Sequence, residues 1–218
     1  MKKITIVTGH YGSGKTNLSV NLAVKAAGEG KSVAIVDLDL VNPYFRTADF
    51  RGFFEEKGIK MIAPDFAGSN LDVPSIQFDV EQLAINEDCL IIDVGGDDAG
   101  AAALGRYAGA LMEFSDDLDM LYVINQRRYL TANANEAVEL MYEIEAAARM
   151  KHTAVVNNTT LGCETTVDII RQSGEFAAKV SAKTGLPLAF TTCPAQLMDE
   201  AGEGFFPVKV YVKNIWDR

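Results

Sequence analysis

Residues 9 to 16 read Gly9-His10-Tyr11-Gly12-Ser13-Gly14-Lys15-Thr16, and this octet decides the fold. It matches the phosphate-binding pattern G-x-x-x-x-G-K-[ST]. The glycines let the backbone curl until successive amide groups point into one hollow that holds phosphate oxygens. The lysine adds a positive charge for the β- and γ-phosphates, and the threonine hydroxyl is a ligand for Mg²⁺. The octet, together with the adjoining Asn17, is therefore predicted to bind a nucleotide.

The flanking sequence supplies the strand and the helix that this motif requires. A β-branched run, Lys3–Thr8, comes directly before the octet, and Leu18, Leu22 and Ala26 follow it at helical spacing. The alternative is a glycine-rich turn that caps an ordinary helix. Because the strand, the loop and the helix follow one another as the motif demands, we favour the phosphate-binding loop.

The rest of the chain alternates apolar, strand-like runs with helical patterns. This alternation predicts an α/β fold with a doubly wound, mostly parallel sheet and helices on both faces. The predicted strands are Ile4–Thr8, Val33–Asp37, Lys60–Ala63, Cys89–Val94, Met120–Asn125, Thr153–Asn157 and Leu188–Thr191, with an edge strand within Phe205–Val212. The predicted helices are Lys15–Glu29, Arg46–Lys57, Val80–Ile85, Gly100–Phe114, Ala132–Met150, Thr166–Lys183 and Ala195–Ala201. We expect residues 1–218 to form a single nucleotide-binding domain.

The longest of these helices, Ala132–Met150, is amphipathic. Its apolar face is predicted to point into the core and its acidic face toward water. The inward residues are Ala134, Val138, Met141 and Ile144, and the outward residues are Glu136, Glu139, Glu143 and Glu145.

Composition restricts the partners and the compartment. The formal net charge is −10, which opposes non-specific binding to nucleic acid or to anionic membranes. No apolar run approaches the ~18 residues of a membrane-spanning helix, and the chain starts without a signal-peptide pattern. Its three cysteines are far apart and form neither a disulfide framework nor a zinc motif. We therefore expect a cytoplasmic protein with no membrane anchor and no nucleic-acid partner.

Acidic residues stand where two of the predicted strands end. Asp37 and Asp39 follow the second strand, and Asp93 closes an apolar strand that leads into Gly95 and Gly96. Ligands of open α/β sheets bind at the carboxyl ends of the strands, and nucleotide-bound Mg²⁺ takes one or two carboxylates. We expect these acids to manage magnesium, and the two glycines to allow a loop that responds to the γ-phosphate. Helix capping or surface exposure is the alternative for each acid.

These motifs resemble those of the MinD/ParA/CobQ/CobB superfamily of P-loop ATPases, over most of the chain. The matching segments are residues 9–16, Asp37-x-Asp39 with Asn42-Pro43, and Asp93-Val94-Gly95-Gly96. The resemblance implies that Asp39 orients the attacking water, that Asp93 serves Mg²⁺, and that Lys15 and Thr16 serve phosphate and metal. The catalytic candidates are thus Lys15 and Asp39, and the metal candidates are Thr16, Asp37, Asp39 and Asp93.

One residue of the resembling pattern is absent. The MinD/ParA branch usually carries a second lysine at or beside the position of His10, which reaches across a dimer, but no lysine lies between Lys3 and Lys15 here. His10 has an ordinary pKa near 6.5, so it is mostly neutral at pH 7. It either contacts phosphate or a partner, or packs within the loop. A homodimer or another protein partner stays open.

The strand that ends at Asn157 bears on the choice of base. The guanine-reading Asn-Lys-x-Asp signature is absent, because the sequence there is Asn157-Asn158-Thr159-Thr160. An asparagine amide offers the donors and the acceptor that adenine needs. By resemblance, Asn157, then Asn158, is the candidate base contact, with Pro194 in a base-flanking loop. A turn-forming asparagine pair is the alternative.

These features together predict a protein that binds Mg·ATP and slowly hydrolyses it to ADP, as a nucleotide switch or a partner-coupled ATPase. One alternative is an ATP-dependent ligase or transferase that activates a small carboxylate, with a pocket formed by residues 42–46 and 64–70. Another is a module that holds nucleotide without turnover. Arg106, Arg127 and Arg128 are the nearest candidates for an arginine-finger role, and Arg127 and Arg128 follow a strand at its carboxyl end, on the site side. Surface charge is the alternative, and the more usual role of such residues.

Overall fold

The computed structural model describes residues 1–39, 51–63, 78–96, 98–129 and 131–211. Within these ranges the chain forms one sheet of eight strands in the order β3-β2-β4-β1-β5-β6-β7-β8, and all neighbouring strands pair in parallel. The strands are β1 (Ile4–Gly9), β2 (Val33–Leu38), β3 (Ile59–Ile62), β4 (Cys89–Val94), β5 (Leu118–Ile124), β6 (Ala154–Asn157), β7 (Leu188–Pro194) and β8 (Phe205–Val208). The predicted doubly wound α/β fold is confirmed.

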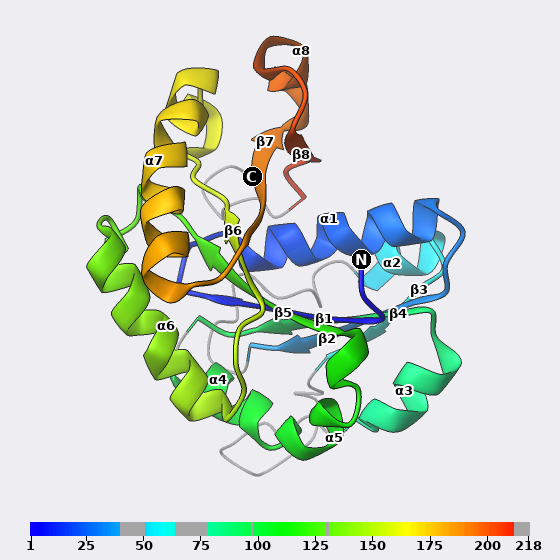
Figure 1. Cartoon of the computed structure of the whole chain (residues 1–218). Coiled ribbons are helices and arrows are strands. Elements are labelled where there is room, and N and C mark those ends of the chain that lie inside the picture. Colours follow the sequence, from blue (N-terminus) through cyan, green and yellow to red (C-terminus); the bar gives the residue numbers. More distant parts are fainter. Residues whose placement is uncertain (40–50, 64–77, 97, 130, 212–218) are drawn as a thin grey trace, which may run out of the picture.

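Helices cover both faces of the sheet (Figure 1). The α-helices are α1 (Lys15–Gly28), α2 (Arg51–Glu56), α3 (Val80–Asn86), α4 (Asp98–Gly105), α5 (Ala108–Met112), α6 (Ala134–Ala148), α7 (Val167–Thr184) and α8 (Met198–Ala201). Short 3-10 turns occur at Ser115–Asp117, Gly162–Glu164 and Ala195–Leu197. One apolar core lies between the sheet and α1 and α2, and the other lies between the sheet and α3 to α7. Every residue of β1, β2 and β4 is buried, which explains their continuous apolar runs.

Strand β1 lies in the middle of the sheet, between β4 and β5. The strand order reverses there, since β4, β2 and β3 lie on one side and β5 to β8 on the other. In open α/β sheets such a reversal opens a crevice at the carboxyl ends of the strands. The octet Gly9–Thr16 begins at this point, so the topology places it where ligands of such sheets bind.

The prediction of one continuous helix over Gly100–Phe114 is wrong. The structure has two helices there, α4 and α5, separated at Arg106 and Tyr107. A guanidinium nitrogen of Arg149, which follows α6, donates a hydrogen bond to the carbonyl of Gly105. A Cβ at Gly105 would come within 2.7 Å of the Ala147 carbonyl oxygen. Contact with the end of α6 therefore competes with continuation of the helix, and the local sequence pattern does not reveal it.

The inward face of α6 is as predicted, whereas its acidic face is not entirely exposed. Met141 and Ile144 are buried, but so is Glu145, which was expected to face water. Its carboxylate accepts hydrogen bonds from Lys151 and His152 beyond the end of the helix. Two donors that lie outside the helical repeat thus account for the burial of this acid.

The predicted edge strand is confirmed as β8, which pairs with β7 and ends at Val208. Beyond it, the backbone of Lys209 bonds to Asn21, and the amide of Tyr211 donates to Asn17 Oδ1, so this segment is attached to α1. The predicted segments 42–46 and 64–70 lie outside the described residues. Within the described ranges, no helix combines the length and the hydrophobicity needed to cross a bilayer.

Candidate functional site

The octet forms the turn between β1 and α1. Gly14 precedes the helix in the left-handed conformation, with φ 88°, and as a glycine it offers no side-chain cap. The amides of the first helical turn have no acceptor within a helix, and they carry the positive end of its dipole. At the other end of the loop, Gly9 has φ 142°, and a Cβ there would lie 2.3 Å from the Val123 carbonyl oxygen. The glycines are therefore required both by backbone shape and by space, and the loop suits an anion.

Two side chains from neighbouring strands hold carbonyl groups of this loop. Arg128 Nε, from the segment after β5, donates to the Gly12 oxygen at 2.8 Å. Asn158 Nδ2, from the end of β6, donates to the Ser13 oxygen at 2.7 Å. These bonds fix the orientation of the loop's peptide groups before any ligand binds, and pre-organisation of this kind lowers the cost of binding.

Asn158 also explains why the second fixed glycine of the motif, Gly14, is needed. A Cβ on Gly14 would lie 2.3 Å from Asn158 Nδ2, so no larger residue fits while this bond exists. The other end of the amide is fixed as well, because Thr192 Oγ1 in β7 donates to Asn158 Oδ1 at 2.6 Å. The phosphate-loop motif is thus attached to both β6 and β7 through one buried asparagine.

A third carbonyl of the loop, that of His10, faces inward. It accepts a hydrogen bond from Ser13 N at 3.1 Å and one from Lys15 Nζ at 3.0 Å. The ammonium group of Lys15 therefore already lies over the loop, where a phosphate would meet it. Burial and, secondarily, the charge of Lys15 lower the pKa of His10. The imidazole of His10 is accordingly neutral at pH 7 and adds no positive charge to the loop.

Asp93 is a fully buried acid at this edge of the sheet. Ser19 Oγ, in α1, donates to its Oδ1 at 2.9 Å, while its Oδ2 is buried and has no hydrogen-bond partner among the described residues. Burial raises the pKa of Asp93 to about 6, although the Thr16 hydroxyl, the Lys15 charge and Ser19 act in the opposite direction, and the charge of Asp39 raises it further. A carboxylate with one unused oxygen thus lies behind the phosphate loop.

Asp37 and Asp39 end the neighbouring strand β2. Asp37 lies in register with Asp93 on β4, so the two carboxyl groups are adjacent on one face of the sheet. Asp39 N donates to Asp37 Oδ1 at 2.9 Å, a local turn that bends the chain just after the strand. Both side chains are buried. Asp37 and Asp93 therefore lie side by side, with Asp39 directly beyond the end of the strand.

The segment after β4 packs directly on the phosphate loop. A Cβ on Gly96 would lie 2.7 Å from the backbone of Tyr11 and 2.8 Å from Lys15 Nζ. A Cβ on Gly100, in α4, would lie 2.6 Å from Gly95. Only glycine allows these approaches, so Gly96 lies directly against Tyr11 and Lys15, and Gly95 lies directly against Gly100 of α4.

Sequence comparison now assigns the family. A sequence model described as the CobQ/CobB/MinD/ParA nucleotide binding domain matches residues 4–161, which is more than half of the chain. The chain belongs to this family. The matched range contains the phosphate loop, the three acids and the asparagine pair, so the earlier resemblance is confirmed. As a member of the CobQ/CobB/MinD/ParA family, the chain is a P-loop nucleotide-binding protein.

Solved structures with a similar fold come from signal recognition particle proteins. FtsY from Thermotoga maritima is 20% identical, with a TM-score of 0.59 over 89% of this chain and 62% of that one. FtsY from Elizabethkingia anophelis in complex with GDP is 17% identical, with a TM-score of 0.59 over 89% of this chain and 58% of that one. The signal recognition particle 54 kDa protein from Aeropyrum pernix K1 in complex with GDP is 19% identical, with a TM-score of 0.56 over 87% and 41%. At these identities the likeness establishes the fold alone. A search of curated proteins gives no match.

The residues of this family member fit a nucleotide-bound magnesium ion. Mg²⁺ at such sites keeps several waters and takes one or two carboxylates together with phosphate oxygens. The buried, unused Oδ2 of Asp93 and the Thr16 hydroxyl are donors of the required type. They would hold the ion, which would neutralise phosphate charge when bound.

The predicted base contacts are occupied by protein groups in this arrangement. Asn157 Nδ2 donates to Ser173 Oγ at 2.8 Å, and its Oδ1 accepts from Thr159 Oγ1 at 2.8 Å. Both ends of its amide are thus engaged, so a base contact requires these bonds to be exchanged. Pro194 is buried at the end of β7. The roles of Asn157, Asn158 and Pro194 at the base stay predictions.

Asn17 was predicted to join the phosphate-binding segment. Its side chain instead bonds to the segment that follows β8, through Nδ2 to the Lys209 oxygen at 3.0 Å and through Oδ1 to Tyr211 N at 2.8 Å. Its position in the first turn of α1 places its backbone amide, rather than its side chain, toward the loop. A role of Asn17 with phosphate would therefore be a backbone role.

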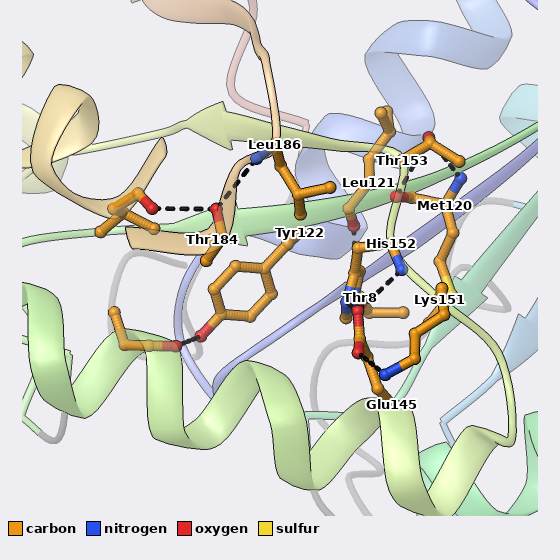
Figure 2. A network of polar contacts seen from close by, with 12 residues as sticks. Thr8, Met120, Leu121, Tyr122, Glu145, Lys151, His152, Thr153, Thr184 and Leu186 are labelled. Atoms are coloured by element: carbon orange, nitrogen blue, oxygen red, sulfur yellow. Dashed lines mark hydrogen bonds and ion pairs between the residues drawn. The ribbon is translucent and has the colours of Figure 1, made fainter. Parts of the chain in front are cut away.

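A second buried polar network lies on the strand that leads into the loop (Figure 2). Thr8 Oγ1 lies 2.7 Å from His152 Nε2, and His152 Nδ1 lies 3.2 Å from Glu145 Oε1. Lys151 Nζ donates to Glu145 Oε2 at 2.6 Å. Burial lowers the pKa of His152 even though Glu145 acts in the opposite direction, so the ring is neutral. This network fixes β1 directly before Gly9, from the side of α6.

Sequence reasoning missed the residues that hold the phosphate loop from outside it. Asn158 was proposed as a base contact, and Arg128 as an arginine-finger candidate or surface charge, whereas both donate to loop carbonyls. One signal was visible in the sequence. Gly12 is not demanded by the motif, and Arg128 Nε lies only 3.3 Å from the position that a Cβ of Gly12 would take. A glycine that the motif does not require therefore indicated that another group packs against the loop. The sequence did not show that this group is Arg128.

Proposed function

We propose that the chain binds Mg·ATP and hydrolyses it slowly to ADP, as a nucleotide switch or as an ATPase coupled to a protein partner. The observation that carries this proposal is the meeting of three groups at one edge of the sheet. They are the preformed loop with Lys15, the unused Oδ2 of Asp93, and the buried Asp39 beside the segment at Gly95. Phosphoryl transfer asks a protein mostly for positioning and charge compensation, which these groups supply.

The proposed roles follow from position. The loop amides and Lys15 bind the phosphates, and Thr16, Asp93 and Asp37 serve the metal. Asp39 would orient the attacking water and complete the metal's surroundings, since its Oδ1 lies 3.3 Å from the position a Cβ of Gly95 would take. The contact of Gly96 with Lys15 supports a switch, because a γ-phosphate bound at the ammonium group must shift or order that segment.

The choice of ATP rests on the residues at the end of β6. The sequence Asn157-Asn158-Thr159-Thr160 lacks the acid that reads guanine in an Asn-Lys-x-Asp signature. The related folds that contain GDP are too distant in sequence to decide the base. We therefore propose ATP, and GTP is the competitor that the experiment must include.

The test measures nucleotide binding and phosphate release by the purified chain with Mg²⁺, using ATP and GTP in parallel. Lys15→Ala removes the cation over the loop and should weaken triphosphate binding about 100-fold or more. Lys179→Ala, an exposed lysine on α7, removes the same charge far from the loop and should change nothing. Chelation of Mg²⁺ should abolish phosphate release.

Three results would contradict the proposal in separable ways. Equal affinity of the Lys15→Ala variant and the native chain for ATP would contradict the proposed nucleotide site. Tight ATP binding with no phosphate release would contradict hydrolysis, and the chain would then be a nucleotide-binding module without turnover. A preference for GTP would remove the assignment of the base while leaving the site intact.

A further inference from the structure

We propose that Arg128 supplies the second positive charge for the bound phosphates, from within the same chain. The inference rests on the proposed function, since it assigns a further phosphate contact at that site. It concerns a residue that lies outside the phosphate-loop motif and reaches the loop from the end of β5.

The contact between Arg128 and the loop is specific. Its Nε donates to the Gly12 oxygen at 2.8 Å. The guanidinium packs against the same residue, because a Cβ on Gly12 would be 3.3 Å from Nε and 3.5 Å from Cζ. Gly12 has φ 73°, a left-handed conformation that glycine adopts without strain. The glycine and the arginine are therefore matched to each other.

The segment that presents Arg128 is itself built by hydrogen bonds. Asn125, buried at the end of β5, accepts from Arg127 N through Oδ1 at 2.9 Å and from Arg128 N through its backbone oxygen at 3.2 Å. Thr131 Oγ1 donates to the same backbone oxygen at 3.0 Å. The turn therefore sets the direction of Arg128, and its neighbour Arg127 is exposed, with no side-chain hydrogen bond among the described residues.

The Arg128 guanidinium has donors to spare. A guanidinium carries five N–H donors, and within the described residues only the one on Nε is used. Arg128 is exposed, and its two terminal nitrogens carry donors in the fork geometry that fits phosphate oxygens. The bond through Nε orients the fork and leaves it available to a ligand.

The negative charges at this edge of the sheet favour a second positive charge in addition to Lys15. Asp37, Asp39 and Asp93 are buried together near Lys15, so acids outnumber the ammonium group. A terminal phosphate group adds roughly two more negative charges at pH 7. One magnesium ion and Lys15 leave part of this charge uncompensated, and Arg128 is the guanidinium in contact with the loop.

The experiment compares affinities for a non-hydrolysable ATP analogue and for ADP, both with Mg²⁺. Arg128→Gln should weaken binding of the triphosphate about tenfold or more and that of ADP by about threefold or less, because the second charge matters most for the outer phosphates. Arg128→Lys should restore part of the loss. Arg127→Gln removes an equal charge from the adjacent position and should change either affinity by less than about twofold.

A mixing experiment tests whether the charge acts within one chain. Lys15→Ala protein carries an intact Arg128, so adding it in excess to Arg128→Gln protein offers that arginine from a second copy. Unchanged affinity of the Arg128→Gln sites supports action within the chain, and recovery of native affinity overturns it.

The remaining outcomes separate this inference from the proposed function. If Lys15→Ala loses triphosphate binding while Arg128→Gln binds as the native chain does, Arg128 has no role with phosphate. If Arg128→Gln weakens the triphosphate and ADP equally, Arg128 only shapes the loop and the charge role is overturned. If Lys15→Ala itself binds normally, the nucleotide site fails and the inference fails with it.

Discussion

Two buried carboxylates near β1 behave in opposite ways. Asp93, at the edge beside the phosphate loop, has a pKa raised to about 6 by burial. Glu145, on α6, is also buried, yet hydrogen bonds from His152 and Lys151 outweigh that burial and lower its pKa to about 2. The same chemical group is thus destabilised as an anion at one place and stabilised as an anion at the other.

The difference lies in what each carboxylate oxygen accepts. Both oxygens of Glu145 accept hydrogen bonds, from Lys151 and from the backbone and ring of His152 (Figure 2). Asp93 accepts from Ser19 through Oδ1 and is also stabilised by the Thr16 hydroxyl, but its Oδ2 has no hydrogen-bond partner among the described residues. A saturated acid serves the fold, whereas an unsaturated buried acid lowers stability unless something else binds it. From this comparison we propose that Glu145 stabilises the fold and that Asp93 binds part of a ligand.

The largest expected effect comes from removing the negative charge of Asp93. Asp93→Asn keeps the hydrogen bond from Ser19 and removes the buried charge. We expect Mg²⁺-dependent triphosphate binding to fall about 100-fold. The free protein at pH 8 should become more stable, by up to about 3 kcal/mol, because the native chain holds an acid whose pKa rises from 3.8 to about 6 on folding. Nucleotide titration and chemical unfolding measure the two effects.

The raised pKa of Asp93 also predicts how the stability difference between the Asp93→Asn variant and the native chain changes with pH. The folded pKa of Asp93 lies above the unfolded one, so its contribution is fully favourable below about pH 4 and is lost as the pH rises through 6. The stability advantage of Asp93→Asn should therefore grow between pH 4 and about pH 6.5 and then level off. Asp116→Asn, at an exposed position, is the control. A constant difference across this range would show that the charge of Asp93 is not the cause.

The second effect concerns Glu145. Glu145→Gln weakens the bonds from Lys151 and His152, and it should lower the free energy of unfolding by about 1–3 kcal/mol at pH 7. Glu139→Gln, on the exposed side of the same helix, should have no measurable effect. Because the folded pKa of Glu145 is depressed, its contribution is present above about pH 4.5 and is lost as the pH falls toward 2. The two proteins should converge in stability over that window, and parallel curves would contradict the assignment.

The smallest effect compares two threonines on β1. The buried Thr5 hydroxyl has no hydrogen-bond partner among the described residues, whereas Thr8 Oγ1 contacts His152 and the Leu121 oxygen. Thr5→Val should raise stability by up to about 1 kcal/mol, and Thr8→Val should lower it by about 1–2 kcal/mol. Thermal unfolding of both variants provides the measurement. Equal losses in the two would show that satisfaction of the hydroxyl is not what distinguishes these positions.

The correct predictions from sequence concern local patterns with a fixed geometry. The octet Gly9–Thr16 required a strand before it and a helix after it, and β1 and α1 are there. Continuous apolar runs such as Cys89–Val94 read directly as buried parallel strands. The expectations that failed needed a distant partner. Gly105 ends α4 because of Arg149, and Glu145 is buried because of Lys151 and His152.

The sequence by itself determined the phosphate loop, the order of strands and helices, and the acids at the strand ends, because periodicity and motif spacing are properties of neighbouring residues. Tertiary structure alone decided which distant side chains hold the loop. Arg128 and Asn158 lie more than a hundred positions from Gly12 and Ser13, and only the parallel sheet brings the ends of β5 and β6 beside the end of β1. Contacts between distant residues likewise decide whether both oxygens of a buried acid have hydrogen-bond donors. Hydrogen bonding depends on which groups are close in space, not on their distance along the sequence.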